Sequence, residues 1–403
     1  MTERTGPENL LATWIDRPEA LGLLSAEWQD LAERVGADVY MRPAWLSVWW
    51  DHFGAGRQLA CVAIRDGDRL VGLLPFCLER VGVGPFSLRI ARLAGTDPHC
   101  IVFQLPLEDS VARAALQLAV EHLTGFLGCS AVSFTPVSDH AAHLPLLREI
   151  SNENKGLILE GRPEGSHVIF DLPTNFRDWL KRLSKNRRSQ FLRYVRNLQD
   201  VYGMRSDDVV PDSTAFADFV AFHDRQWQAA GRGGHFTDWP GSAAFYCDLA
   251  DRFAEEPPMR LYRLIGTSGP LTTYFTLNSG ETAHWRLPAR CLDPETERLS
   301  LGKVGLLLMI EVLIGQGVRR IEAGRGDYDY KLAYGGQSVP VHRLLFCPAT
   351  RAGRLRLRLL LACADLLNLL YYRIWFKKLV PRLRYCFGFR PHPLWRIWIR
   401  TRL

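Results

Sequence analysis

The sequence predicts a mixed α/β (α+β) protein made of two halves that are built alike. Its 403 residues are 47% hydrophobic and 23% charged, which is typical of a globular chain long enough for two domains. Strand-like runs joined by glycine-containing turns occur in both halves, and each half also contains a helix-like segment. These observations predict a mixed sheet flanked by helices in each half.

The first half contains a predicted β-hairpin. Residues 59–64 and 70–76 are strand-like, and the RDGD sequence at 65–68 supplies an Asp-Gly turn of the kind that favours a tight hairpin. A further strand is expected near Ile101, followed by a helix over about 110–126.

The second half contains a predicted three-stranded meander. Residues 260–265, 271–277 and 282–288 are strand-like and are separated by TSGP and NSGE turns. A helix over about 303–316 follows, and then a strand over 318–323. This half is therefore expected to have the same mixed character as the first.

We place a domain boundary near the sequence GRPEG, because turn-forming residues cluster there. The predicted division is residues 1–160, residues 161–350 and a tail of residues 351–403. The tail carries 13 basic residues and one acidic residue, whereas the rest of the chain is mildly acidic. A positive charge confined to the tail favours membrane headgroups or an acidic protein partner over DNA.

Neither a secretory signal nor a metal site is predicted. The N-terminus MTERTGPENL has no basic segment followed by an apolar stretch, so the expected location is the cytoplasm. The nine cysteines are scattered without metal-ligand spacing. His223, His235 and Asp238 also lack the spacing of metal ligands on a helix.

Residues 180–203 predict an amphipathic basic helix. Seven basic residues lie between Lys181 and Arg196, and apolar residues recur at roughly helical spacing. The helix can simply present a solvated face. Alternatively, it forms a positive wall for an anionic ligand, whose phosphates would pair with Arg187, Arg188 or Arg193.

The sequence ERLSLGKVGLLLMIEVLIGQG, residues 297–317, predicts a polar turn that opens into an apolar helix. Unpaired N–H groups at a helix start, the positive end of the helix dipole and glycines that permit close approach favour pyrophosphate binding. The turn has neither the GxxxxGK[ST] nor the GxGxxG pattern, so an ordinary turn is the alternative. The residues predicted to bind the cofactor are Arg298, Ser300, Leu301, Gly302, Lys303, Val304 and Gly305.

The loop GRGDYDYKLAYGG, residues 324–336, combines glycines with acids, bases and tyrosines at the end of a predicted strand. Such groups bind ligands or move protons. The RGD tripeptide within the loop can arise by chance in a chain of this length and, without a secretory context, does not indicate cell adhesion. The loop is therefore predicted to face a substrate.

The order of strand, hairpin, strand, glycine-containing turn, helix and strand resembles the GNAT acyltransferase fold. Several stretches resemble more narrowly the bacterial GNAT branch of cellulose-biosynthesis CelD-type acetyltransferases, which are related to the Fem-type aminoacyltransferases. Their order and spacing make the resemblance more specific than any one motif. The stretches are PAWLSVWWDHFG (43–54), RDGDRLVGLLPF (65–76), LSKNRRSQFLRYVRNL (183–198), FVAFHDRQWQAAG (219–231), LSLGKVGLLLMIEVLIGQGVRRIEAGRGDYDYKLAYGG (299–336) and VHRLLF (341–346).

The resemblance implies two GNAT-like modules in tandem, the second of which carries the site for acetyl-CoA or another acyl-CoA. The first module has no glycine pair before its helix. It is therefore expected to be degenerate and to act as a structural or acceptor-binding partner. The loop at 324–336 would then face the thioester carbonyl.

Acyl transfer from a thioester to an amine needs a base for the amine and an acid for the leaving thiolate. Asp327 or Glu322 is the predicted base, and Tyr330 or Tyr334 is the predicted acid. Glu322 can instead pair with an arginine such as Arg320, and the tyrosines can simply pack. The residues predicted to contact the acceptor are Arg325, Lys331, His284, Arg286 and Arg187.

The favoured function is an acyl-CoA-dependent N-acyltransferase that works by direct transfer in a ternary complex. The resemblance points to a small-molecule or saccharide amine acceptor, such as an amino sugar or a precursor in cell-surface polysaccharide biosynthesis. Two alternatives remain. One is a catalytically silent GNAT-like module that serves as a scaffold in a polysaccharide machine, and the other is a Fem-like transferase that uses aminoacyl-tRNA.

In the basic tail, residues 351–403, the longest stretch without a basic residue is expected to be too short and too polar to span a bilayer. A predicted helix within it has a wide leucine-rich face. Two interpretations follow. The leucines pack against the rest of the chain, or the helix lies on the inner membrane surface and holds the enzyme there.

Overall fold

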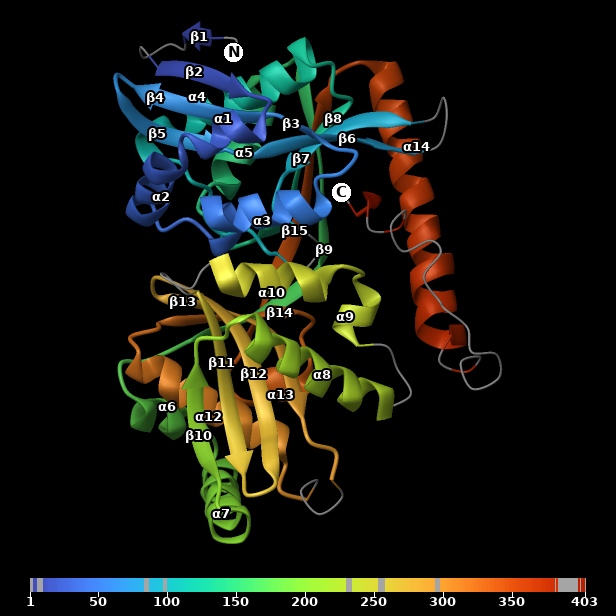
Figure 1. Ribbon diagram of the computed structural model, residues 1–403. Coiled ribbons are helices and arrows are strands. Elements are labelled where there is room, and N and C mark those ends of the chain that lie inside the picture. Colours follow the sequence, from blue (N-terminus) through green and yellow to red (C-terminus); the bar gives the residue numbers. More distant parts are fainter. Residues whose placement is uncertain are drawn as a thin grey trace. The chain divides into compact units, whose positions relative to one another are not determined.

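The computed structural model describes residues 3–5, 10–82, 87–96, 100–229, 234–252, 258–293, 298–380, 382, 398 and 400–402 (Figure 1). The chain divides into two compact units. Unit 1 consists of Met1–Gly165 and Pro340–Leu403, and unit 2 consists of Ser166–Val339. Residues 340–403 therefore return to the first unit, whereas the predicted domain boundaries at 160 and 350 remain predictions.

Unit 1 contains two groups of strands. One is an antiparallel sheet with the order β1-β2-β4-β5, and the other has the order β15-β8-β7-β6-β3. The predicted hairpin is present, with Asp66 opposite Arg69 and Gly67 at a φ of 57°. The strands are β1 Glu3–Thr5, β2 Leu10–Ile15, β3 Gln58–Leu59, β4 Cys61–Asp66, β5 Arg69–Leu74, β6 Phe76–Val81, β7 Leu88–Leu93, β8 Ala131–Ser138 and β15 Gln337–Pro348, the last of which begins in unit 2.

The prediction of a strand near Ile101 is wrong. Ile101 and Val102 are buried, but Val102 forms only an isolated bridge with Val137. Their apolar character therefore reflects core packing and not a strand. The helical segments of unit 1 are α1 Pro18–Gly22, α2 Ser25–Arg34, η1 Val39–Met41, α3 Pro43–Phe53, α4 Asp109–Glu121, η3 His122–Phe126, α5 Leu144–Glu153, α14 Arg351–Leu367 and η4 Asn368–Leu379.

Unit 2 is built on the strand order β10-β11-β12-β13-β14-β9. The predicted meander is present as β11, β12 and β13, which pair antiparallel. The strands are β9 Leu157–Asp171, which enters from unit 1, β10 Arg205–Val209, β11 Met259–Gly266, β12 Gly269–Ser279, β13 Thr282–Arg290 and β14 Arg320–Arg325. The helices are α6 Phe176–Arg182, α7 Lys185–Tyr202, α8 Ser213–Ala229, α9 His235–Asp238, α10 Ser242–Arg252, α12 Leu301–Gly315 and α13 Asp329–Ala333.

Helices cover both faces of the unit 2 sheet (Figure 1). Successive residues of a strand point to opposite faces, and Tyr274 and Phe275 of β12 show this alternation. Tyr274 belongs to the core cluster that contains α6, α7 and α12. Phe275 packs instead against Phe216 of α8 and Tyr246 of α10, with ring centroids 4.9 and 5.1 Å apart. Unit 2 is therefore a three-layer arrangement, and the predicted mixed α/β class is confirmed.

Helix α14 packs its inner face against the sheet of unit 1. Leu357, Leu360 and Leu361 belong to a buried cluster with β6, β7, β8 and β15. Arg162 of β9 holds the helix through both guanidinium nitrogens, at 2.7 and 2.5 Å from the Asp365 carboxylate. The packing interpretation of the tail therefore holds for residues 351–367.

The helical segment continues without a break from Arg351 to Leu379, and by length and composition alone it could cross a membrane. The sequence analysis predicted that this segment is too short to span a bilayer, and that prediction is wrong. That expectation counted only the stretch between basic residues, whereas the helix runs on through Arg373. The buried core helix of a soluble protein can meet the same criterion.

The packing of α14 predicts a contrast between two leucines on its opposite sides. Leu357 is fully buried, so Leu357→Ala should lower the free energy of unfolding by about 2–5 kcal/mol because it leaves a cavity. Leu355 is 60% exposed, and Leu355→Ala should change it by no more than about 0.5 kcal/mol. Urea titrations measure both values. Equal effects of the two substitutions would contradict this placement of the helix.

Candidate active site

The parallel ladder between β13 and β14 ends in the middle of the unit 2 sheet. It pairs three residues of each strand, and the last pair is His284 with Glu322. Just beyond this pair, β13 is irregular opposite β12 and β14 is irregular opposite β9. Gly324 has a φ of 73°, a left-handed conformation that favours glycine. Both strands therefore change course after His284 and Glu322, where the pairing of β13 with β14 ends.

A carboxylate flanked by two histidines is buried at the end of this ladder. His167, His284 and Glu322 are each no more than 1% exposed. Glu322 Oε1 accepts a hydrogen bond from the Gly324 N–H at 2.8 Å and lies 3.3 Å from His167 Nδ1. Glu322 Oε2 lies 3.9 Å from His284 Nδ1.

The two histidines determine whether the Glu322 carboxyl group is ionised. Burial alone would raise its pKa, but the hydrogen bond with His167 and the charges of His167 and His284 outweigh burial and lower the pKa to about 2. The carboxylate is therefore ionised at neutral pH, and its partners are these histidines. The alternative interpretation from the sequence, in which Glu322 pairs with an arginine such as Arg320, does not describe this environment.

Lys331 of α13 closes the loop that follows β14. Its side chain is buried, and Nζ donates to the carbonyl oxygens of Ala323, Gly326 and Gly324 at 2.6, 3.3 and 3.5 Å. Burial lowers its pKa to about 8, although the carboxylate of Glu322 opposes this shift. Three carbonyl acceptors use the three donors of an ammonium group. This geometry favours a role in shaping the loop over the predicted contact with an anionic acceptor.

The tyrosines of the loop occupy different environments. Tyr330 is 41% exposed, and partial burial raises the pKa of its hydroxyl to about 12. Tyr334 is buried, its pKa is also raised by burial, and the Arg187 guanidinium lies 5.9 Å from its ring centroid. Tyr330 is therefore the more accessible candidate acid, whereas Tyr334 packs in the core cluster. Asp327, the other candidate base, is exposed.

The other residues predicted to bind the acceptor do not contact one common group. Arg187 donates to the Ala333 carbonyl oxygen at 2.7 Å, and Arg286 donates to the Tyr246 hydroxyl at 3.1 Å. Arg325 ends β14 and is partly buried. The structure thus brings Glu322, His284 and the Lys331 loop together at the end of the ladder, while Arg187 supports the far end of the loop.

The start of α12 is the turn that the sequence predicts to bind phosphate. Ser300 precedes the helix with a φ of 50°, and its carbonyl oxygen accepts the first N–H groups of the helix, from Lys303 and Val304. The N–H groups of Leu301 and Gly302 come before these bonds and are directed out of the helix start. A Cβ atom on Gly302 would meet no heavy atom closer than 3.9 Å, so the approach to the backbone is open.

The other residues of the turn divide into two groups. Arg298 and Lys303 are exposed and can add positive charge. Gly305 faces the sheet instead, because a Cβ atom there would lie 2.6 Å from Thr272 Oγ1 and 2.7 Å from Tyr274 Cε2. Val304 is likewise buried. The geometry therefore gives Gly305 and the Val304 side chain a packing role.

Sequence reasoning missed His167. This residue lies on β9, and its contact with Glu322 joins positions that are 155 residues apart. No local sequence pattern marks His167 as a functional residue. It follows the turn-forming sequence GRPEG, which we interpreted only as a domain boundary. Within the described parts of the chain, no cluster of three or more His, Cys, Asp or Glu side chains is arranged to hold a metal ion.

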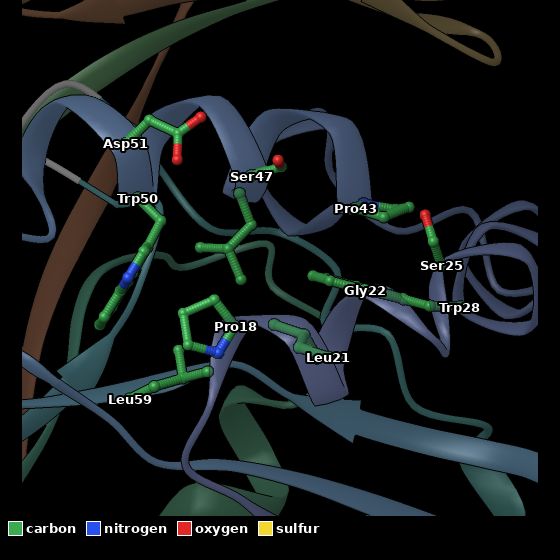
Figure 2. Close-up of a pocket in the computed structure, with 11 residues that line it drawn as sticks. Pro18, Leu21, Gly22, Ser25, Trp28, Pro43, Ser47, Trp50, Asp51 and Leu59 are labelled. Carbon is green, nitrogen blue, oxygen red and sulfur yellow. The ribbon is translucent and has the colours of Figure 1, made fainter.

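Unit 1 contains a separate apolar pocket, shown in Figure 2. Side chains of α1, α2 and α3 surround it, and Asp51 is the charged residue among those that line it. No buried group of polar side chains converges on this pocket in the way that the histidines converge on Glu322. The lining residues are Pro18, Leu21, Gly22, Ser25, Trp28, Pro43, Leu46, Ser47, Trp50, Asp51 and Leu59.

Residues 185–332 match the Acetyltransferase (GNAT) domain family. This segment contains the basic helix α7, the start of α12, the end of the β13–β14 ladder and Lys331. The match confirms the predicted acyltransferase class of enzyme. The narrower CelD-type resemblance remains a prediction, and a search of curated proteins found no match to the chain.

Several solved structures are similar to the chain at low sequence identity. FemX is 9% identical with a TM-score of 0.56, and the alignment covers 79% of this chain and 95% of FemX. L-PGS from Bacillus licheniformis is 11% identical, with a TM-score of 0.47 and coverage of 81% and 92%. A tandem GNAT protein from the clavulanic acid biosynthesis pathway is 14% identical, with a TM-score of 0.41 and coverage of 84% and 99%. The likeness to FemX supports the predicted fold class and concerns the fold alone.

The two glycines of the α12 turn should respond differently to a methyl group. Gly305→Ala should lower the free energy of unfolding by about 1–3 kcal/mol, because the new Cβ overlaps Thr272 and Tyr274. Gly302→Ala should leave stability unchanged within about 0.5 kcal/mol. Chemical denaturation measures both. A larger loss for Gly302→Ala would show that the turn is packed differently.

The lowered pKa of Lys331 makes a prediction for alkaline pH. Between about pH 8 and pH 10.5 the folded chain holds this amine neutral, while the unfolded chain still binds the proton. The stability of the wild-type chain should therefore rise with pH in this window relative to Lys331→Met. Unfolding free energies at several pH values measure the difference. Lys303→Met, at an exposed lysine, serves as the control and should keep the rise. Parallel pH profiles for wild type and Lys331→Met would contradict the assignment.

Proposed function

We propose that the chain is an N-acyltransferase that moves an acyl group directly from acyl-CoA to an amine acceptor in a ternary complex. The observation that carries the proposal is that β13 passes both the buried carboxylate and the start of α12. The strand begins beside the buried Glu322 carboxylate at His284 and ends at Arg290, whose side chain lies beside Gly302 at the start of α12.

The distance along β13 fits the cofactor. The six residue-to-residue steps from His284 to Arg290 span about 20 Å of extended strand. An extended pantetheine arm covers a distance of this order. With the pyrophosphate at the Leu301 and Gly302 N–H groups, the thioester would lie near the end of the ladder, where the pairing of β13 with β14 stops. Arg298 and Lys303 would add charge to the phosphate end.

The chemistry needs a proton acceptor for the attacking amine. A carboxylate whose pKa is about 2 is a weak base. We therefore assign Glu322 the role of positioning His284, whose Nδ1 lies 3.9 Å from the carboxylate. His284 would receive the proton, directly or through water. The exposed Asp327 is the alternative base.

The leaving thiolate needs a proton donor. The Tyr330 hydroxyl, whose pKa is raised to about 12, remains protonated at neutral pH and can supply it. When the amine nitrogen bonds to the acyl carbon, the carbon–sulfur bond breaks and free CoA leaves as the thiol. Lys331 contributes by holding the loop through its three carbonyl contacts.

Acetyl-CoA is the cosubstrate that the GNAT resemblance favours. We propose an amino sugar, or a precursor used in cell-surface polysaccharide biosynthesis, as the acceptor. This finer proposal is supported by the CelD-type resemblance of the stretches quoted above. The silent scaffold remains the outcome expected if no CoA ligand binds.

Aminoacyl transfer is the second candidate. The solved structure of FemX shares the fold, and α7 presents Lys185, Arg187, Arg193 and Arg196 as exposed basic residues. Exposed cations on one helix favour a phosphate-rich donor such as an aminoacyl-tRNA. A transferase of this type would not need the open turn at Gly302.

Gly302→Val tests the acyl-CoA proposal. A branched side chain at the open turn should weaken CoA binding at least tenfold, or about 1.4 kcal/mol, because it blocks the approach to the backbone N–H groups. Gly315→Val is the matched control, since Gly315 lies at the other end of α12 and also has open space. Titration calorimetry with CoA and acetyl-CoA gives the affinities. If wild type binds neither ligand, or Gly302→Val binds as tightly as Gly315→Val, the proposed site is wrong.

A further inference from the structure

We propose that the helical segment of residues 351–379, formed by α14 and η4, is a membrane-surface element that binds anionic lipid. This proposal is independent of acyl transfer. It starts from the observation that the segment has two apolar sides and that the sheet of unit 1 covers only one of them.

The second apolar side is exposed over the whole length of the segment. At about 100° per residue, Leu355, Leu359 and Leu366 of α14 lie within about 40° of one another and opposite the buried Leu357. These three leucines are 60%, 57% and 55% exposed. The row continues along η4. The exposed aliphatic side chains of this lipid-facing stripe are Leu355, Leu359, Leu366, Leu369, Leu370, Ile374 and Leu379.

Cations flank the stripe at both ends. At the start, Arg351 and Arg356 are exposed. At the end, Arg373, Lys377 and Lys378 are exposed. The single acid of the segment, Asp365, is neutralised by its two contacts with Arg162. An apolar stripe between clusters of basic residues is typical of helices that lie in the interface of an anionic membrane.

The segment lies on the membrane and does not span it. To cross a bilayer, it would have to remove Leu357, Leu360 and Leu361 from the core of unit 1. It would also have to break the Arg162–Asp365 pair and the Arg358–Glu160 pair, whose shortest contact is 2.9 Å. These contacts hold the segment to the unit with the stripe facing outward.

Charge favours a lipid surface over a second copy of the chain. Two copies packed stripe to stripe would bring clusters of the same sign together, whereas anionic headgroups would neutralise them. Each basic residue near such a surface contributes about fivefold in affinity. The leucines add apolar contact at the depth of the headgroups.

Vesicle sedimentation of the full chain tests the proposal. The wild-type chain should bind vesicles of phosphatidylcholine and phosphatidylglycerol at low salt, should be released at high salt and should ignore vesicles of phosphatidylcholine alone. Leu359→Gln combined with Leu366→Gln should weaken binding at least tenfold. The matched control combines Leu23→Gln with Leu192→Gln, at exposed leucines outside the stripe, and should bind as wild type does.

A variant that lacks three of the basic residues separates the contribution of charge from that of the apolar stripe. Arg373→Gln, Lys377→Gln and Lys378→Gln together should weaken binding more than tenfold and reduce its salt dependence. Melting temperatures confirm that each variant is folded, because all these side chains are exposed. Absence of binding by the wild type, or equal binding by the stripe variant and its control, would overturn the proposal. A concentration-dependent dimer that only the stripe variant abolishes, without vesicle binding, would assign the stripe to a second copy instead.

Discussion

The candidate site depends on one buried charge, the Glu322 carboxylate between His167 and His284. A lone carboxylate in this position would be costly, because no solvent reaches it. The two histidines and the Gly324 N–H compensate for that cost and fix the carboxylate at the last pair of the β13–β14 ladder. From this point the two strands take separate courses, and this is where we propose that the thioester binds.

In the proposed mechanism, the same strand connects the thioester end of acyl-CoA with its phosphate end. β13 carries His284 at the carboxylate and Arg290 beside the open turn of α12, so one rigid element sets the distance between them. Helix α12 is held in turn by Gly305, which lets it approach Thr272 and Tyr274 closely. In the proposed site, the packing of the sheet and the position of the cofactor would therefore depend on two nearby glycines. A Cβ atom would fit at Gly302, whereas at Gly305 it would overlap Thr272 and Tyr274.

Local signals predicted the elements that local chemistry controls. Asp-Gly and Ser-Gly turns marked the hairpins, and the polar turn before an apolar run marked the start of α12. The sequence could not reveal contacts made between distant strands. His167 reaches Glu322 only because β9 pairs with β14, and the Lys331 ammonium turns inward only because the loop carbonyls converge on it. The buried run at Ile101 resembled a strand because core packing and strand pairing select the same side chains.

Hydrogen exchange of the full chain with and without acetyl-CoA tests the central claim most directly. Amides that bind phosphate oxygens exchange slowly, so the account predicts that acetyl-CoA slows exchange in residues 300–305 and in the part of β13 beyond His284. Exchange in β11, which is separated from β13 by β12, should not change. Protection that appears elsewhere and spares both segments, or no protection at a saturating ligand concentration, would contradict the account.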